Sequence, residues 1–99
     1  MIVARREAPC RLRITGHAGY APTGQDIVCA AVSALWGALE AELRARERSG
    51  QGRLTVGPDV LAFAPERPHR RETEALFGLV WRGVAAIAAE YPAFVRAER

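Results

Sequence analysis

The sequence has no lysine, and it has no apolar run near the 20 or so residues needed to cross a bilayer. Its first residues soon turn charged and lack the apolar stretch of a signal peptide. We therefore expect a cytoplasmic protein without a membrane segment. All 14 basic residues are arginine, and with 11 acidic residues they give a formal net charge of +3. Such a mildly basic chain suits a ribosomal or nucleic-acid neighbour but carries no polybasic patch.

Cysteine and histidine are also scarce, with two of each in the chain. In a reducing cytoplasm we do not expect Cys10 and Cys29 to form a structural disulfide. Together with His17 and His69 they could supply four metal ligands, but the close CxxC or HxxxH spacing of structural zinc sites is missing. We expect neither a metal nor a cofactor.

Two nucleotide-binding patterns are absent as well. The glycines at 16, 19 and 24 fit neither GxGxxG nor the Walker spacing, so no phosphate loop is predicted. The arginines at 5–6 and between 67 and 71 have no interleaved aromatic residues on which bases could stack. Direct binding of nucleic acid is therefore not expected.

The chain of 99 residues is long enough for one modest core, and half of its residues are hydrophobic. We expect a single domain over 1–99. Alternating and helical apolar patterns predict the order ββαββα with a possible last strand. An α+β fold follows, a two-layer sandwich whose mostly antiparallel sheet carries both helices on one face. The predicted strands are 1–7, 10–16, 53–56 and 60–64, and a short last strand can follow at 93–95. The predicted helices are 27–48 and 71–90.

Each predicted element has a face suited to the core. In the second strand Cys10 alternates with polar residues and should point inward, as a small core residue. The first helix carries an aliphatic stripe at spacings of three and four, and the second helix carries a similar one. The first stripe is Val28, Val32, Leu35, Leu39 and Leu43; the second is Leu76, Val80, Val84 and Ile87, with Leu79 and Gly83 alongside.

One stretch combines groups that could do chemistry. His17 follows directly after a predicted strand, and Cys29 lies within the first two turns of the next helix. Between them runs a loop that contains Gly19 and Gly24. An imidazole that reaches a thiol can act as its general base, and amide groups at a helix start favour the thiolate. His17 and Cys29 are therefore candidates for a base and a nucleophile.

Other residues accompany the cysteine. Asp26 is either the N-cap of the helix or the acidic end of a capping box that begins at Thr23. Ser33 and Trp36 lie four and seven residues after Cys29, so they share its side of the helix. Asp26 and Ser33 are thus candidate supporting residues.

The segments Gly16-His17-Ala18 and Asp26-Ile27-Val28-Cys29-Ala30-Ala31-Val32-Ser33 resemble the signature of the ribosomal-processing cysteine protease family, Prp. The resemblance implies a bacterial endopeptidase that removes an N-terminal extension from a large-subunit ribosomal protein. It assigns a catalytic dyad to His17 and Cys29 and accompanying positions to Asp26 and Ser33. It further implies a homodimer, no metal, and a mobile substrate loop in which Gly19 and Gly24 lie.

A second hypothesis belongs to another class. The net positive charge and the arginine clusters are also compatible with a non-enzymatic binding module that associates with the ribosome or with RNA.

Overall fold

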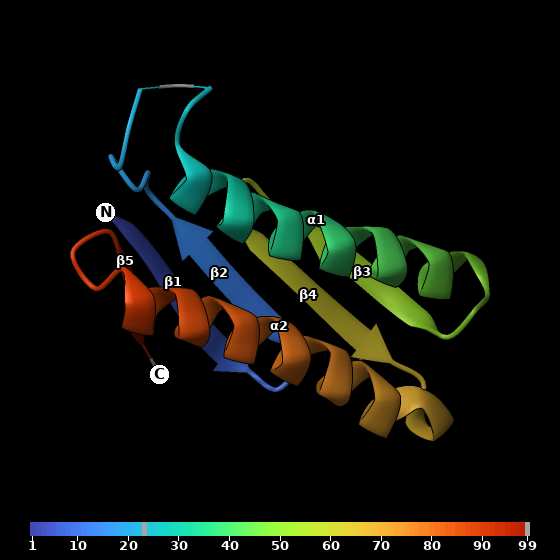
Figure 1. Cartoon of the computed structure of the whole chain (residues 1–99). Coiled ribbons are helices and arrows are strands. Elements are labelled where there is room, and N and C mark those ends of the chain that lie inside the picture. The colour runs from blue at the N-terminus through green and yellow to red at the C-terminus, as the bar shows by residue number, and fades with distance from the viewer. Residues whose placement is uncertain (23, 99) are drawn as a thin grey trace.

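Five strands form one mixed sheet, and two long helices cover one of its faces (Figure 1). The computed structural model describes residues 1–22 and 24–98. The α+β prediction with both helices on one face is confirmed. In chain order the elements are β1 (Ile2–Ala8), β2 (Arg11–Thr15), α1 (Ile27–Arg48), β3 (Gly52–Val56), β4 (Val60–Pro65), a 3-10 turn (Arg67–His69), α2 (Arg70–Glu90) and β5 (Val95–Glu98).

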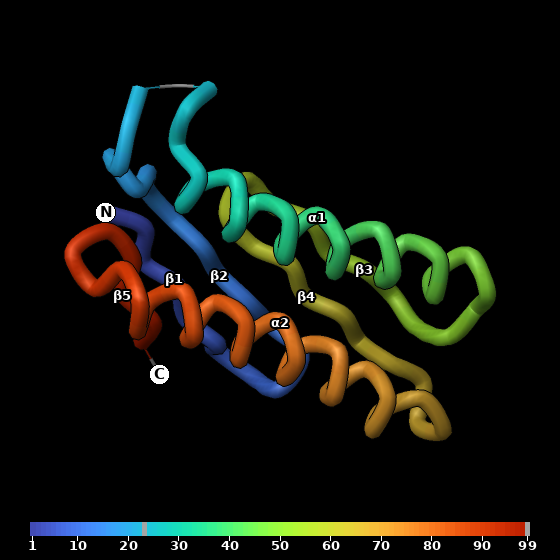
Figure 2. The backbone as a smooth tube through the Cα atoms, in the orientation of Figure 1, coloured from blue at the N-terminus to red at the C-terminus, as the bar shows by residue number. Residues whose placement is uncertain are grey.

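The strands lie in the order β3-β4-β2-β1-β5. The β1–β2 and β3–β4 hairpins are antiparallel, and β4 joins them by pairing with β2. Only β5 runs parallel to its neighbour β1, because α2 returns the chain to that edge (Figure 2). The last strand, expected at 93–95, instead begins at Val95. Phe94 belongs to the turn before it and accepts a backbone hydrogen bond from Ile2.

The covered face of the sheet forms half of the core. Ala4, Leu12 and Leu61 from three adjacent strands are fully buried there. The expectation that Cys10 is a small core residue inside a strand needs correction. Because β2 begins only at Arg11, Cys10 lies in the turn before it, half-buried at the margin of the core.

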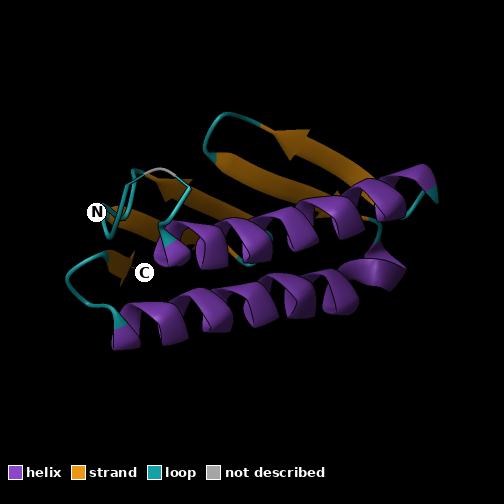
Figure 3. Ribbon diagram, turned by 45° about the horizontal axis from the view of Figure 1, so that its top comes forward, coloured by secondary structure: helices purple, strands orange, loops and turns teal. Residues whose placement is uncertain are grey.

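Helix α1 confirms most of the predicted stripe. Val28, Val32, Leu39 and Leu43 are buried, while Leu35 is half-buried and points to the second helix. There it meets Gly83 of α2, where an added Cβ would come within 2.9 Å of the Leu35 side chain. This close approach lets the two helices lie side by side across the sheet (Figure 3).

The core face of α2 confirms the prediction at Val80 and Val84 and differs from it elsewhere. Its buried residues are Thr73, Phe77, Val80, Trp81 and Val84. The expected Leu76 and Ile87 only flank this face, and Leu79 is 69% exposed. The two aromatic side chains determine the helix orientation, since they remove more apolar area from water than a leucine does. Leu79, two positions after Phe77, then lies on nearly the opposite side, about 200° around the helix.

Neither helix of the described chain is long and apolar enough to span a membrane.

The orientation of α2 can be tested by truncating one side chain on each face. Phe77→Ala should lower the free energy of unfolding by about 3–5 kcal/mol, because Phe77 is only 1% exposed and its removal leaves a cavity. Leu79→Ala should change it by less than about 0.5 kcal/mol. Urea unfolding followed by circular dichroism measures both. Equal losses from the two substitutions would contradict this orientation.

Candidate active site

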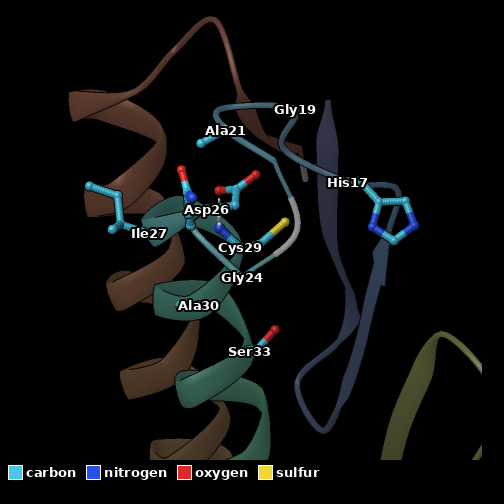
Figure 4. Close-up of a pocket in the computed structure, with 10 residues that line it drawn as sticks. His17, Gly19, Ala21, Gly24, Asp26, Ile27, Cys29, Ala30 and Ser33 are labelled. Carbon is cyan, nitrogen blue, oxygen red and sulfur yellow. Dashed lines mark hydrogen bonds between the residues drawn. The ribbon is translucent and has the colours of Figure 1, made fainter.

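A cavity of about 630 Å³ lies where β2 ends and α1 begins (Figure 4). Its walls come from the loop 16–26 and from the first two turns of α1. The candidate residues of the sequence analysis therefore meet around one space. The lining residues are His17, Gly19, Ala21, Gly24, Gln25, Asp26, Ile27, Cys29, Ala30 and Ser33.

The backbone at Gly16 determines where His17 leaves the sheet. Gly16 has a φ of +86°, and a Cβ there would collide with the backbone carbonyl of Met1. Only glycine fits such a left-handed turn so close to the backbone of Met1. The turn ends β2 and places His17, which is exposed, at the rim of the cavity.

Asp26 connects the loop to the helix through both of its carboxylate oxygens. Its Oδ1 accepts a hydrogen bond of 2.9 Å from the backbone N–H of Cys29, and its Oδ2 accepts one of 3.1 Å from that of Tyr20. Asp26 is thus the N-cap of α1. The hydrogen bond from Cys29 is the main reason why the pKa of the Asp26 carboxyl lies below its ordinary value. Thr23, the alternative start of a capping box, lies outside the described residues.

The thiol of Cys29 is held by the loop as well as by the helix. Its Sγ accepts a hydrogen bond of 3.3 Å from the backbone N–H of Ala18, whose side chain is buried. The sequence analysis did not find this contact, because a backbone N–H has no residue signature.

The structure brings His17 and Cys29 to the same cavity but not into contact. No hydrogen bond joins their side chains among the described residues. Figure 4 shows the imidazole at the rim, directed away from the sulfur. An exposed side chain can turn about χ1 at little cost. The dyad geometry therefore requires a rotation of His17, a movement of its loop, or both.

Ser33 and the two loop glycines complete the wall. Ser33 lies one helical turn beyond Cys29, where it is exposed. Gly19 and Gly24 both have positive φ, +69° and +89°. Trp36 does not line this cavity; with Ser33 and Ile14 it borders a smaller hollow further along α1.

An aromatic contact that sequence reasoning missed holds the first half of the loop. The ring of Tyr20 packs edge-on against Tyr91 and Phe94, with centroid separations of 5.7 and 5.2 Å. Tyr91 and Phe94 belong to the turn between α2 and β5. The loop is therefore attached to the far end of the chain through residues 71 and 74 positions apart, a contact that no local pattern encodes.

The remaining candidates lie elsewhere. Cys10 lies at the opposite end of β2, and burial raises the pKa of its thiol. Both cysteines are free. Over residues 1–22 and 24–98, no three histidine, cysteine, aspartate or glutamate side chains converge as metal ligands would.

The contributions of the charge and of the acceptor oxygens of Asp26 can be separated by comparing Asp26→Ala with Asp26→Asn. The folded state holds the pKa of this carboxyl below its ordinary 3.8, so its stabilisation is present above that pH and is lost as the pH falls through the folded pKa. The midpoint of urea unfolding should be lower in Asp26→Ala at pH 7, and this difference should shrink below about pH 4. Asp26→Asn keeps a hydrogen-bond acceptor, so its midpoint of urea unfolding should fall less than that of Asp26→Ala. A difference as large at pH 2 as at pH 7 would contradict the charge-based cap.

A family model described as cysteine protease Prp matches residues 1–96. Crystal structures of the ribosomal processing protease Prp from S. aureus are similar in fold. The complex with a covalently linked product peptide has 19% identity, coverage of 99% of this chain and 98% of that chain, and a TM-score of 0.75. The complex with a substrate peptide has 17% identity, coverage of 98% and 95%, and a TM-score of 0.66.

SMU.848 from Streptococcus mutans has 26% identity, coverage of 98% of this chain and 88% of that chain, and a TM-score of 0.62. A search among curated proteins finds no match. The family model nevertheless spans almost the whole chain and includes both walls of the cavity. The protein therefore belongs to the cysteine protease Prp family.

Proposed function

We propose that this protein is a cysteine endopeptidase in which Cys29 is the nucleophile and His17 the general base. The observation that carries the proposal is the shared cavity: it is open, it contains both side chains, and the sulfur already accepts the N–H of Ala18. Family membership supplies the reaction class.

The first half of the reaction transfers the acyl part of the substrate to Cys29. His17, once turned inward, takes the thiol proton, and the sulfur attacks the carbonyl carbon of the scissile bond. The carbonyl oxygen becomes an oxyanion that backbone N–H groups near the sulfur stabilise, with that of Ala18 the nearest candidate. When the C–N bond breaks, His17 returns its proton to the leaving amine.

The second half releases the acyl group. His17 takes a proton from water, and the resulting hydroxide attacks the thioester carbonyl. The C–S bond then breaks and His17 returns the proton to the sulfur, which leaves the free thiol and a carboxylic acid that ionises in water. Asp26 is a positioning residue here, because it holds the N–H of Cys29 and the loop at Tyr20. We assign Ser33 to the wall that receives the substrate chain.

We propose that the substrate is the N-terminal extension of a bacterial large-subunit ribosomal protein. The S. aureus relatives are ribosomal processing proteases bound to a substrate or product peptide, and this chain shares their fold. We propose that the loop carrying Gly19 and Gly24 moves to admit such a peptide. His17, which now faces away from the sulfur, would be turned inward by that movement.

The dyad is tested with peptides that span the junction between extension and mature protein. Cys29→Ala should abolish cleavage, and His17→Ala should lower kcat/KM by about 10²–10⁴-fold, as expected for a lost general base. Cleavage is measured by mass spectrometry of the two products.

Cys10→Ala is the matched control, since it removes the other thiol at the far end of β2 and should cleave like the parent protein. Equal cleavage by the parent, Cys29→Ala and His17→Ala would contradict the dyad. If the peptides were cleaved only at other sites, and this cleavage still required Cys29 and His17, the result would support a cysteine endopeptidase but contradict the proposed substrate.

We also propose, from the resemblance, that the protein is a homodimer in the bacterial cytoplasm. The chain has a mass of 10.8 kDa, so light scattering after size exclusion should give about twice this value. A mass equal to that of one chain at micromolar concentration would contradict the dimer.

A further inference from the structure

The sheet face opposite the helices carries the excess charge of the whole protein. The strand registers place five arginines and two glutamates on this face, because each alternates with residues that point to the core. This excess of three positive charges equals the formal net charge of +3, so the rest of the chain balances nine arginines against nine acidic residues. The residues of this arginine face are Arg5, Glu7, Arg11, Arg13, Arg53, Arg96 and Glu98.

Two carboxylates hold four of the guanidinium groups in place. Nε of Arg11 and Nε of Arg13 donate to the two oxygens of Glu7, at 2.8 and 3.1 Å. On the neighbouring strands β1 and β5, Nε of Arg5 and Nε of Arg96 lie 2.8 and 2.7 Å from the two oxygens of Glu98. Each guanidinium has five N–H donors, so two carboxylates cannot accept them all. The array retains both net charge and donors for a further anion.

We propose that the arginine face docks the phosphate backbone of RNA, a second function beside the protease site. Arginine forks match phosphate oxygens, and here they are ordered before any ligand arrives. A hollow of about 450 Å³ lies between the pairs, and Arg11 and Arg53 do not line it. Its lining residues are Val3, Arg5, Glu7, Arg13, Thr15, Arg96 and Glu98. It shares no residue with the cavity at Cys29.

The chemistry of the face favours RNA over a protein partner or a second copy. Protein interfaces have an apolar core from which charge is depleted, whereas this face has charge at its centre. A twofold contact between two such faces would place like charges together. Nucleic-acid interfaces are polar and strongly positive. Without aromatic residues on the face, contacts go to phosphates and are independent of base sequence.

This proposal departs from the expectation that direct nucleic-acid binding is absent. That expectation rested on the lack of aromatic residues for base stacking among the arginines at 5–6 and 67–71, whereas the contacts proposed here go to phosphates. The sheet instead gathers arginines from four strands, and only one residue of those clusters, Arg5, lies on the face.

The test is binding of a fluorescent oligouridylate longer than about 16 nucleotides, followed by anisotropy at several salt concentrations. Four phosphate contacts predict that the affinity of the parent protein falls about fifty-fold between about 50 and 200 mM salt. The double variant Arg11→Gln, Arg13→Gln should bind more weakly, and its affinity should fall only about seven-fold. Its peptide cleavage should equal that of the parent, which separates this proposal from the protease function.

The matched control is Arg44→Gln, Arg48→Gln, which removes the same charge from the exposed side of α1. It should retain the salt dependence of the parent protein. Glu98→Gln should tighten binding, because it removes a competing carboxylate. Three results would each overturn the proposal: no binding of RNA, an equal loss in the control, or tighter binding of a polyglutamate of equal length than of the RNA.

Discussion

The carboxylate of Asp26 is the interaction on which the arrangement of the site depends. One of its oxygens caps the first turn of α1 at Cys29, and the other holds the incoming loop at Tyr20. A helix start leaves its first N–H groups without partners, and a side chain that satisfies one of them decides where the helix begins. The same bond therefore determines the position of the thiol relative to the loop. The N–H of Ala18 can then reach the sulfur.

The two halves of the site differ in how firmly they are held. Cys29 is bonded through its backbone and its sulfur, whereas His17 is exposed and turned away. Tyr20, between them in the chain, packs on Tyr91 and Phe94. In the proposed mechanism the nucleophile is thus ordered in the free protein, and the base has to be brought to it. Under that proposal the dyad is completed when a peptide occupies the cavity, which would limit reaction with other carbonyl compounds.

The sheet separates two kinds of surface. Its covered face contributes fully buried residues such as Ala4, Leu12 and Leu61 to the core. Its open face carries the paired arginines and glutamates, whose alternation with the core residues follows from the two-residue period of a strand. A shift of register by one residue would move charge into the core. The apolar packing on one face therefore also determines the spacing of the guanidinium groups on the other.

Much of this protein is encoded locally. Alternation and helical spacing determined the ββαββα order, the stripe from Val28 to Leu43 and the proximity of His17 and Cys29 to one loop. Local patterns have a short range, so they could not place what depends on distant neighbours. Packing decided that Phe77 and Trp81, not Leu79, face the core, since only the sheet distinguishes one apolar stripe of α2 from the next. It also placed Tyr20 against Phe94, the N–H of Ala18 against Cys29, and arginines from four strands on one face. Most of these contacts join residues far apart in the chain, and the Ala18–Cys29 contact depends on how one loop folds back on α1, so only the tertiary structure brings them together.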